Sequence, residues 1–296
     1  MSNLGMRNLV LDKELPKMNF RLFGQQINKP CKHLFLAATL VATLAACSSD
    51  DKPAYVERPV EELYNSANNA LKAGENEDAA RLFDEVERQH PYSVWASKAQ
   101  LMAAFALYSD NKYDDAISAL DRFIDLHPGN RDTPYAYYLK ALCYYEQISD
   151  VGRDQKMTRD ALSSLRDVVR RFPDTKYARD AQLKVDLAND HLAGKQMTIG
   201  RFYLNRKEYL AAINRFRTVI GQYQTTTHVP EALHRLVEAY LALGIIDEAQ
   251  ATAAVLGHNF PGERWYQDSY ALLTGQDLEP EEKDGSWISQ VWDSIL

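Results

Sequence analysis

The chain has 296 residues, with 34 Lys and Arg against 41 Asp and Glu, and its formal net charge is −7. Hydrophobic residues make up 46% and charged residues 25%, a composition typical of globular proteins, so extensive disorder is excluded. The sequence has no run of Lys and Arg of the kind that follows a phosphate backbone, so nucleic acid is not an expected partner. Three cysteines are too few for a disulfide framework.

Residues 1–46 have the pattern of an export signal. A basic stretch at residues 29–33 precedes thirteen uncharged residues, 34–46. In a helix these would span about 20 Å, less than the ~30 Å hydrocarbon core of a bilayer, so a signal peptide is expected rather than a transmembrane helix. The segment ends in Leu44-Ala45-Ala46-Cys47, which resembles the lipobox of bacterial lipoproteins. The resemblance implies cleavage before Cys47, lipid on its thiol and, because Ser48 follows, delivery to the outer membrane. A plain secretory signal is the alternative.

Residues 47–58 are expected to form a polar, lipidated tether. Removal of residues 1–46 takes away six basic and two acidic residues, which leaves 28 against 39 and a net charge of −11. A body this acidic is not expected to hold an anionic membrane surface by charge, so the acyl chains would supply the attachment.

From residue 59 the chain repeats itself, and the repeats end in a similar way. Five segments end at a terminating residue, which is proline in four of them: Pro91, Pro128, Pro173, Gln224 and Pro261. An alanine stands twelve residues before each terminator: Ala79, Ala116, Ala161, Ala212 and Ala249. An upstream segment has its own small residue: Ala67, Ala104, Ala141 and Gly200. Small residues on an apolar helix face let a neighbouring helix approach closely.

This pattern resembles the tetratricopeptide repeat, a helix–turn–helix unit. It predicts an all-α solenoid of five helix pairs over residues 59–275. The terminators are 37, 45, 51 and 37 residues apart, so the third and fourth repeats are extended. The third has a polar insertion around residues 148–158. Residues 176–207 have a helical pattern without proline, and we expect one continuous helix of about 45 Å there.

The lipobox, the uneven repeats and the segments 121–128 (DRFIDLHP) and 135–142 (YAYYLKAL) together resemble the BamD family of lipoproteins. BamD is a subunit of the machine that folds β-barrel proteins into the outer membrane of Gram-negative bacteria. The resemblance implies an outer-membrane lipoprotein that faces the periplasm. Its implied partners are BamA, other Bam lipoproteins and unfolded outer-membrane proteins.

The first helices of a tetratricopeptide array line a concave face that can hold an extended peptide. By repeat position the side chains expected on this face are Tyr64, Asn68, Phe105, Tyr108, Tyr135, Tyr138 and Tyr145. Aromatic rings offer a large contact area at low rotamer cost, which suits a substrate signal rich in aromatic residues. The alternative is that these rings belong to the core.

A second candidate surface is basic and lies in the fourth repeat. On an acidic chain the arginines there stand out, and the resemblance implies that this region docks BamA through carboxylates. The basic residues of this surface are Arg201, Arg206, Lys207, Arg215 and Arg217. Arg201, Arg215 and Arg217 are the docking candidates, and Arg215 is the main one. A solvated helix face is the alternative.

The C-terminal end differs in character. Residues 276–285 are acidic and read as a flexible linker, and residues 286–296 form a short amphipathic tail with Trp287 and Trp292. Such a tail could dock on a partner or on lipid, or it could fold back onto the last repeat.

Catalysis is not expected. The sequence has no H-E-x-x-H, G-x-S-x-G, phosphate-loop or C-x-x-C motif, and its histidines lack metal-ligand spacing. Cys143 lies within a helical pattern and reads as a small core residue. No metal and no cofactor are expected. The alternative functions are a periplasmic tetratricopeptide adaptor that coordinates peptidoglycan enzymes or the Tol–Pal system, and a lipid-tethered chaperone without a fixed partner.

Overall fold

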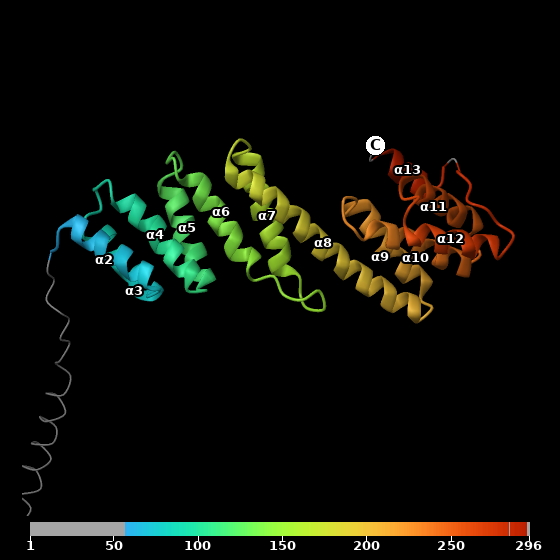
Figure 1. Cartoon of the computed structure of the whole chain (residues 1–296), viewed down its shortest axis with the longest axis horizontal. Helices are drawn as coiled ribbons and strands as arrows, with labels where there is room; N and C mark the ends of the chain where they lie inside the picture. The colour runs from blue at the N-terminus through green and yellow to red at the C-terminus, as the bar shows by residue number, and fades with distance from the viewer. Residues whose placement is uncertain (1–56, 284, 295–296) are drawn as a thin grey trace, which may run out of the picture. The chain divides into compact units, whose positions relative to one another are not determined.

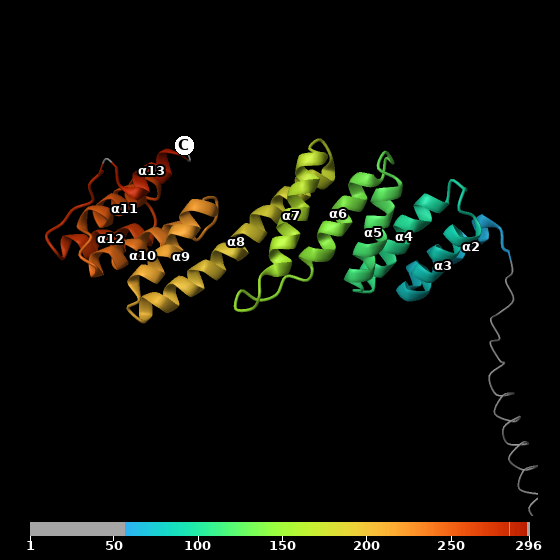
Figure 2. The ribbon, with the colours of Figure 1, turned by 180° about the vertical axis from the view of Figure 1, so that it is seen from behind.

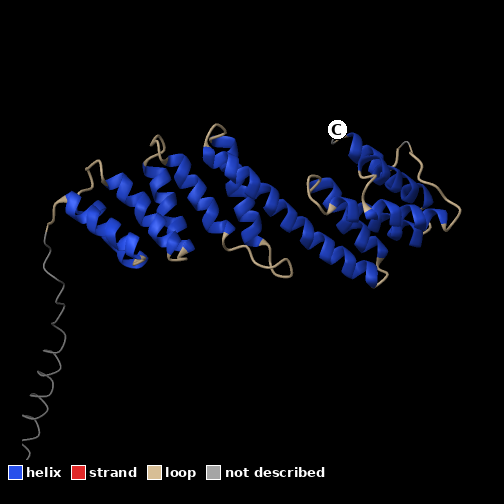
Figure 3. Cartoon of the chain, viewed as in Figure 1, coloured by secondary structure: helices blue, strands red, loops and turns tan. Residues whose placement is uncertain are grey.

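The computed structural model describes residues 57–283 and 285–294. In this part of the chain all regular elements are α-helices, as Figure 3 shows. The expected signal peptide, Cys47 and the tether up to residue 56 lie outside the described residues. No helix in the described part is both long enough and apolar enough to span a membrane.

Ten of the helices form five consecutive pairs, each joined by a turn or loop. Each helix also packs on the next one along the chain, so the pairs stack in sequence order (Figures 1 and 2). This confirms the predicted all-α tetratricopeptide solenoid. The pairs are α2 (Val60–Ala73) with α3 (Asn76–Gln89), α4 (Ala96–Ser109) with α5 (Tyr113–Leu126), α6 (Thr133–Tyr145) with α7 (Lys156–Arg171), α8 (Lys176–Asn205) with α9 (Tyr209–Gln222), and α10 (Val229–Ala242) with α11 (Ile246–Asn259).

The turns have repeated backbone geometry. Four of the turns inside a pair contain one residue with a left-handed backbone, where glycine and asparagine are favoured: Gly74, Asn111, Lys207 and Gly244. The second helix of each pair ends at a residue whose φ lies between −131° and −134°: His90, His127, Phe172, Tyr223 and Phe260. The terminating residue follows directly, and in four repeats it is the proline that prevents continuation of the helix.

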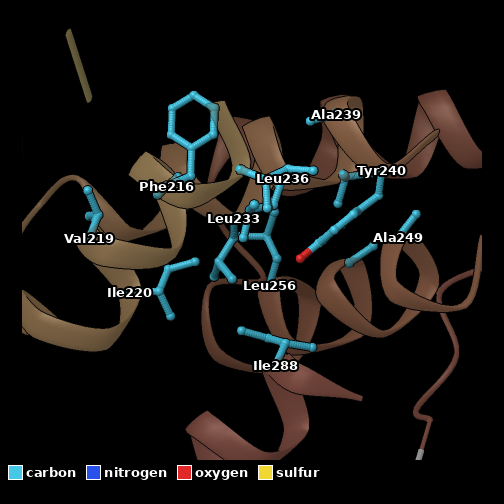
Figure 4. Packing of buried hydrophobic residues seen from close by; sticks show 14 of the residues in the cluster. Phe216, Val219, Ile220, Leu233, Leu236, Ala239, Tyr240, Ala249, Leu256 and Ile288 are labelled. Atoms are coloured by element: carbon cyan, nitrogen blue, oxygen red, sulfur yellow. The ribbon is translucent and has the colours of Figure 1, made fainter. Parts of the chain in front are cut away.

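Small residues let the paired helices approach closely. The five alanines that precede the terminators by twelve residues are completely buried. At Gly200 an added Cβ atom would lie 2.4 Å from the ring of Phe216, so the backbone of α8 lies directly against that ring. Figure 4 shows the C-terminal part of the core, in which Phe216, Leu236 and Leu256 from α9, α10 and α11 belong to one buried cluster.

Helix α8 is one continuous helix of 30 residues, as the proline-free pattern predicts, and it is about 45 Å long. Its first half, including Ala181 and Val185, packs in a cluster with α7, whereas Ala193 and Met197 belong to the cluster of α9 and α10. Helix α8 therefore packs both against α7, the second helix of the preceding pair, and against α9, the second helix of its own pair. The fourteen extra residues of this repeat shift α9–α11 by about 21 Å along the axis of α8.

The insertion in the third repeat is a loop that contacts the middle of α8. The His191 ring nitrogen Nε2 lies 2.8 Å from the Ser149 carbonyl oxygen. Lys195 Nζ donates to the Gly152 carbonyl at 3.0 Å. The loop between α9 and α10 also reaches this region, because Thr227 donates to Asp190 Oδ1 through its hydroxyl at 2.9 Å. Two loops therefore attach to the same stretch of α8.

Two further helices follow the fifth pair. Helix α12 (Arg264–Thr274) packs on α10 and α11, and α13 (Trp287–Asp293) packs on α11. Ile288 of α13 is completely buried, so the C-terminal tail folds back onto the last repeat, which was one of the two alternatives. The acidic segment expected as a flexible linker also contacts α11, since Gln250 Nε2 donates to the Glu279 carbonyl at 2.7 Å.

Candidate functional site

Six partly exposed aromatic rings lie on the first helices α4, α6 and α8: Phe105, Tyr108, Tyr135, Tyr138, Tyr145 and Tyr177. We call this set of rings the aromatic groove, after the concave face that the repeat pattern predicts. The ring of Tyr177, in the first turn of α8, lies 5.5 Å from that of Tyr135 and 5.4 Å from that of Tyr138. On α4 the rings of Phe105 and Tyr108 are 6.4 Å apart. Side chains from three successive repeats therefore form the groove.

Burial raises the pKa of three phenol groups in this groove, those of Tyr108, Tyr135 and Tyr138. Burial, with a smaller effect of Glu146, raises the pKa of Tyr108 to about 12. Burial also raises the pKa of Tyr135 to about 12. The Tyr138 hydroxyl donates to Asp180 on α8, and Lys184 Nζ lies 4.8 Å from the centre of the Tyr145 ring. The groove thus combines apolar ring surface with polar groups that fix the orientation of the rings.

Tyr64 does not lie on this groove, although the repeat position predicted that it would. Its side chain is 8% exposed and packs against Phe83 at 5.3 Å and Trp95 at 4.8 Å between ring centres. The ring is buried because Phe83 of α3 and Trp95, the residue directly before α4, pack against it. Asn68, one turn further along α2, is partly exposed.

The sequence analysis missed three residues that extend the groove onto α8: Tyr177, Leu183 and Leu187. Leu183 and Leu187 are 64% and 58% exposed. They stand ten and fourteen residues after Pro173, the same offsets that relate Tyr138 and Leu142 to Pro128. These offsets could have identified them. The fourth residue after a terminator is a further signal, because it is aromatic in three repeats: Trp95, Tyr177 and Trp265.

The three arginines of the predicted basic surface face different neighbours. Arg201 Nη1 donates to both carboxylate oxygens of Glu231 on α10, at 3.0 and 2.9 Å. Arg217 Nε donates to the Tyr240 hydroxyl at 3.0 Å, and its guanidinium lies 4.4 Å from the centre of the Trp287 ring. Both are therefore occupied by contacts within the chain.

Arg215 differs from these two. Its Nη1 donates to Gln196 Oε1 on α8 at 3.3 Å, and it makes no ion pair with any residue of 57–283 or 285–294. Gln196 itself lines a cavity described below. Arg215 is thus a partly exposed cation that has an amide partner and no carboxylate partner in the described chain.

A basic cleft lies where α7, the middle of α8 and the end of α9 meet. It consists of two adjoining cavities of about 630 and 520 Å³ that share Arg159, Leu192 and Tyr223 as lining residues. Further cations line it: Arg153, Arg166, Arg170 and Lys195. We call this region the junction cleft. It exists because the length of α8 separates α9 from α7.

The charge of the junction cleft is only partly compensated. Arg170 pairs with Asp167, which also lines the cleft. For Arg153, Arg159 and Arg166 the described part of the chain supplies no carboxylate within ion-pair distance. Arg166 has only a 3.4 Å hydrogen bond to the Asn189 amide oxygen. The sequence analysis missed the arginines of α7. Arg166 and Arg170 follow Arg159 by seven and eleven residues, so all three share one helix face.

The described residues show no arrangement for metal chemistry. No group of three or more His, Cys, Asp or Glu side chains among them is placed to hold a metal ion. Cys143 is completely buried, and burial raises the pKa of its thiol to about 12. The described chain thus presents two distinctive surfaces, a set of partly exposed aromatic rings and a cleft lined by several cations.

The repeated helix pairs define the class of this protein as an α-solenoid of the tetratricopeptide type. The family model described as an outer membrane lipoprotein, YfiO, matches residues 56–256. The outer membrane protein assembly factor BamD of Caulobacter vibrioides is 54% identical over 249 residues, 83% of this chain and 82% of that protein. BamD of Rickettsia prowazekii is 48% identical over 80% of this chain and 96% of its own length. The chain belongs to the BamD family of outer-membrane protein assembly factors.

Among solved structures, the TPR2AB domain of yeast Sti1 in complex with an Hsp90 peptide is similar to this chain. It matches 73% of this chain and 84% of its own, with a TM-score of 0.39 and 14% identity. The repeated helix pairs themselves, described above, establish the architecture.

Proposed function

We propose that this chain is a lipid-anchored scaffold of the β-barrel assembly machinery. It is anchored through Cys47 in the outer membrane, faces the periplasm, docks on BamA, and binds segments of unfolded outer-membrane proteins. It performs no catalysis. The observation that carries the proposal is the aromatic groove of α4, α6 and α8, because it offers an extended apolar surface in a chain that belongs to a family of assembly factors.

Substrate chemistry fits the groove. A β-strand places alternate side chains on one face, so a membrane β-strand presents a row of apolar and aromatic residues to a partner. Rings in the groove gain from stacking with such residues, and pairs of aromatic rings contribute about 0.5–1.5 kcal/mol beyond area burial. Leu183 and Leu187 extend the apolar surface along α8.

The groove is tested with a peptide from the C-terminal strand of an outer-membrane protein. Removal of the Phe105 ring in Phe105→Ala takes away contact area in the groove, and we expect the Kd of the peptide to rise about tenfold. Tyr270→Ala on α12, which removes a 44% exposed ring away from the groove, is the matched control. Unchanged affinity in Phe105→Ala, or an equal loss in both variants, would contradict the assignment.

BamA docking is assigned to Arg215 and the junction cleft. Arginines without carboxylate partners are suited to bidentate pairing with the carboxylates of another protein, and this pairing is strongest where water is excluded. Leu192 and Tyr223 add apolar surface to the same cleft. Arg201 and Arg217, which have partners within the chain, are expected to support the local fold of this region.

Charge-reversal variants distinguish arginines that dock BamA from an arginine that does not. Arg215→Glu and Arg159→Glu should each weaken co-purification of BamA by tenfold or more, because like charges then face the acidic partner. Arg206→Glu is the control, since Arg206 is exposed and pairs with Glu208 at 2.9 Å at the far end of α8. Full retention of BamA by both the Arg215→Glu and the Arg159→Glu variant would refute the docking site while leaving the groove untouched.

The anchor is tested separately. Mass spectrometry of the mature chain should find acyl groups on Cys47, and Cys47→Ser should move the protein from the outer-membrane fraction to the soluble periplasm, because two or more acyl chains supply most of the membrane affinity. An unmodified Cys47 in a membrane-bound chain would overturn the anchor.

A further inference from the structure

The loop between α3 and α4, residues 90–95, exposes apolar side chains fully. Tyr92 is 101% exposed and Val94 is 89% exposed, the largest values among the exposed large hydrophobic residues of the described chain. A single exposed apolar residue is ordinary on a protein surface. Two that alternate in one short loop, both almost fully exposed, are available to an external partner.

Equivalent loops in the other repeats provide an internal comparison. Each connects the second helix of one pair to the first helix of the next pair, so all make the same kind of connection. After their terminating residues they are polar or glycine-rich: Gly129-Asn130-Arg131, Asp174-Thr175, Thr225-Thr226-Thr227 and Gly262-Glu263. The repeat architecture therefore does not require apolar residues here. Tyr92 and Val94 belong to the first such loop alone.

This first loop lies where the N-terminal segment joins the solenoid. The Arg58 N–H donates to Gln89 Oε1 at 2.9 Å, and the Arg58 carbonyl oxygen lies 2.7 Å from His90 Nε2. Arg58 is therefore bound to Gln89, which precedes the loop, and to His90, the first residue of the loop. Figure 1 shows the loop between α3 and α4 beside the start of α2.

Cys47 is only eleven residues before Arg58. A fully extended chain of eleven residues spans at most about 40 Å, so an acylated Cys47 keeps the lipid surface within that distance of Arg58. We infer that the loop with Tyr92 and Val94 inserts into the periplasmic surface of the outer membrane, as a second, non-covalent contact beside the acyl anchor.

The chemistry of the two side chains fits a lipid surface. Tyrosine has an apolar ring and a polar hydroxyl and is enriched at membrane interfaces, and valine gains from removal of its side chain from water. The inference rests on the proposed function in one respect, because it requires the acyl anchor at Cys47. Its consequence is that two points hold the first repeat at the membrane, which orients the groove relative to the lipid surface.

The experiment uses the acylated full-length chain in vesicles of phosphatidylethanolamine with a minority of phosphatidylglycerol. An environment-sensitive NBD fluorophore is placed on Tyr92→Cys or, as the matched control, on Gly129→Cys in the equivalent loop of the next repeat. An added Cβ at Gly129 meets no atom within 4 Å, so this control is tolerated sterically. The buried thiol of Cys143 is shielded from the label.

We expect NBD at position 92 to shift to shorter wavelength on vesicles and to be quenched by lipids brominated in their acyl chains, while NBD at position 129 does neither. If the chain floats with the vesicles and NBD at 92 stays in water, or both positions respond alike, the inference is overturned and the anchor stands. If the chain carries no acyl group and stays off the vesicles, the inference and the proposed anchor fall together. If NBD at 92 shifts only when an outer-membrane protein peptide is added, the occupant is protein and the lipid contact is refuted.

Discussion

The substitution Gly200→Ala tests the close packing of α8 on α9. Gly200 lies inside the 30-residue helix α8, and a Cβ atom added there would lie 2.4, 2.8 and 2.9 Å from Cε1, Cζ and Cδ1 of Phe216. Favourable contacts between carbon atoms occur at about 3.5–4.0 Å. The overlap with the nearest ring carbon is therefore more than about 1 Å.

Two effects of opposite sign decide the result. Alanine stabilises a helix interior by about 1 kcal/mol relative to glycine. Overpacking in a well-packed core destabilises by about 1–3 kcal/mol, and here the upper part of that range applies because Phe216 is completely buried and cannot turn toward solvent. We expect Gly200→Ala to lower the free energy of unfolding by about 1–2 kcal/mol.

Gly221→Ala is the matched control on the neighbouring helix. Gly221 lies near the end of α9, and an added Cβ there meets no atom within 4 Å. The higher helix propensity of alanine is then the only effect, and we expect the free energy of unfolding to rise by about 0.5–1 kcal/mol. Urea unfolding followed by circular dichroism measures both variants, and each kcal/mol corresponds to about 2–4 °C in Tm for a chain of this size. A Gly200→Ala variant as stable as the parent would refute the close contact.

Other expected outcomes follow from single side chains. Tyr64→Ala should lower stability by about 3 kcal/mol because the ring is buried against two others, whereas Phe105→Ala should leave the Tm nearly unchanged, and two equal losses would contradict the boundary drawn between core and groove. Ile288→Ala should release α13, visible as faster hydrogen exchange in residues 287–293 with little change elsewhere; unchanged exchange there would show that the tail does not depend on this side chain. Burial lowers the pKa of His234, so the unfolded chain binds its proton first, and stability should fall as pH drops below about 6.5; His234→Gln should reduce that slope, and an identical slope would rule this histidine out. Cys143 should react with a thiol reagent at about pH 9 only after unfolding, because burial raises its thiol pKa to about 12; rapid labelling of the folded chain would contradict this.

Repeat positions predicted much of the groove and failed at one residue for a definite reason. Five of the seven predicted groove residues are partly exposed rings on α4 and α6, because the position relative to the small residue of a first helix specifies a face of that helix. Tyr64 and Tyr138 both stand three residues before such a small residue, and Tyr64 is nevertheless buried, because Trp95 of the loop before α4 covers it. The exposure of a ring on a first helix depends on which side chains the neighbouring repeat packs against it, and the sequence of one repeat does not contain that information.

The basic surface shows that closeness along the chain does not predict which charged side chains meet in space. The sequence drew attention to Arg201, Arg215 and Arg217 because they lie close together along the chain. In the structure two of them bind partners within the chain, and Arg215 donates to Gln196, which lines the junction cleft together with Arg153 and Arg159. Charge compensation is a matter of distance in space, so proximity in sequence was a poor guide.

Local patterns were enough to predict the helices, their pairing and the single continuous α8, because terminating prolines, small residues and the 3.6-residue period of apolar side chains act over short stretches of chain. The sequence also determined family membership through motifs spread over the whole chain. Tertiary structure alone decided which rings are exposed, that α8 separates α7 from α9 to form the junction cleft, and that the C-terminal tail packs on α11. These features depend on contacts between residues distant in sequence, and no local pattern specifies which surfaces meet.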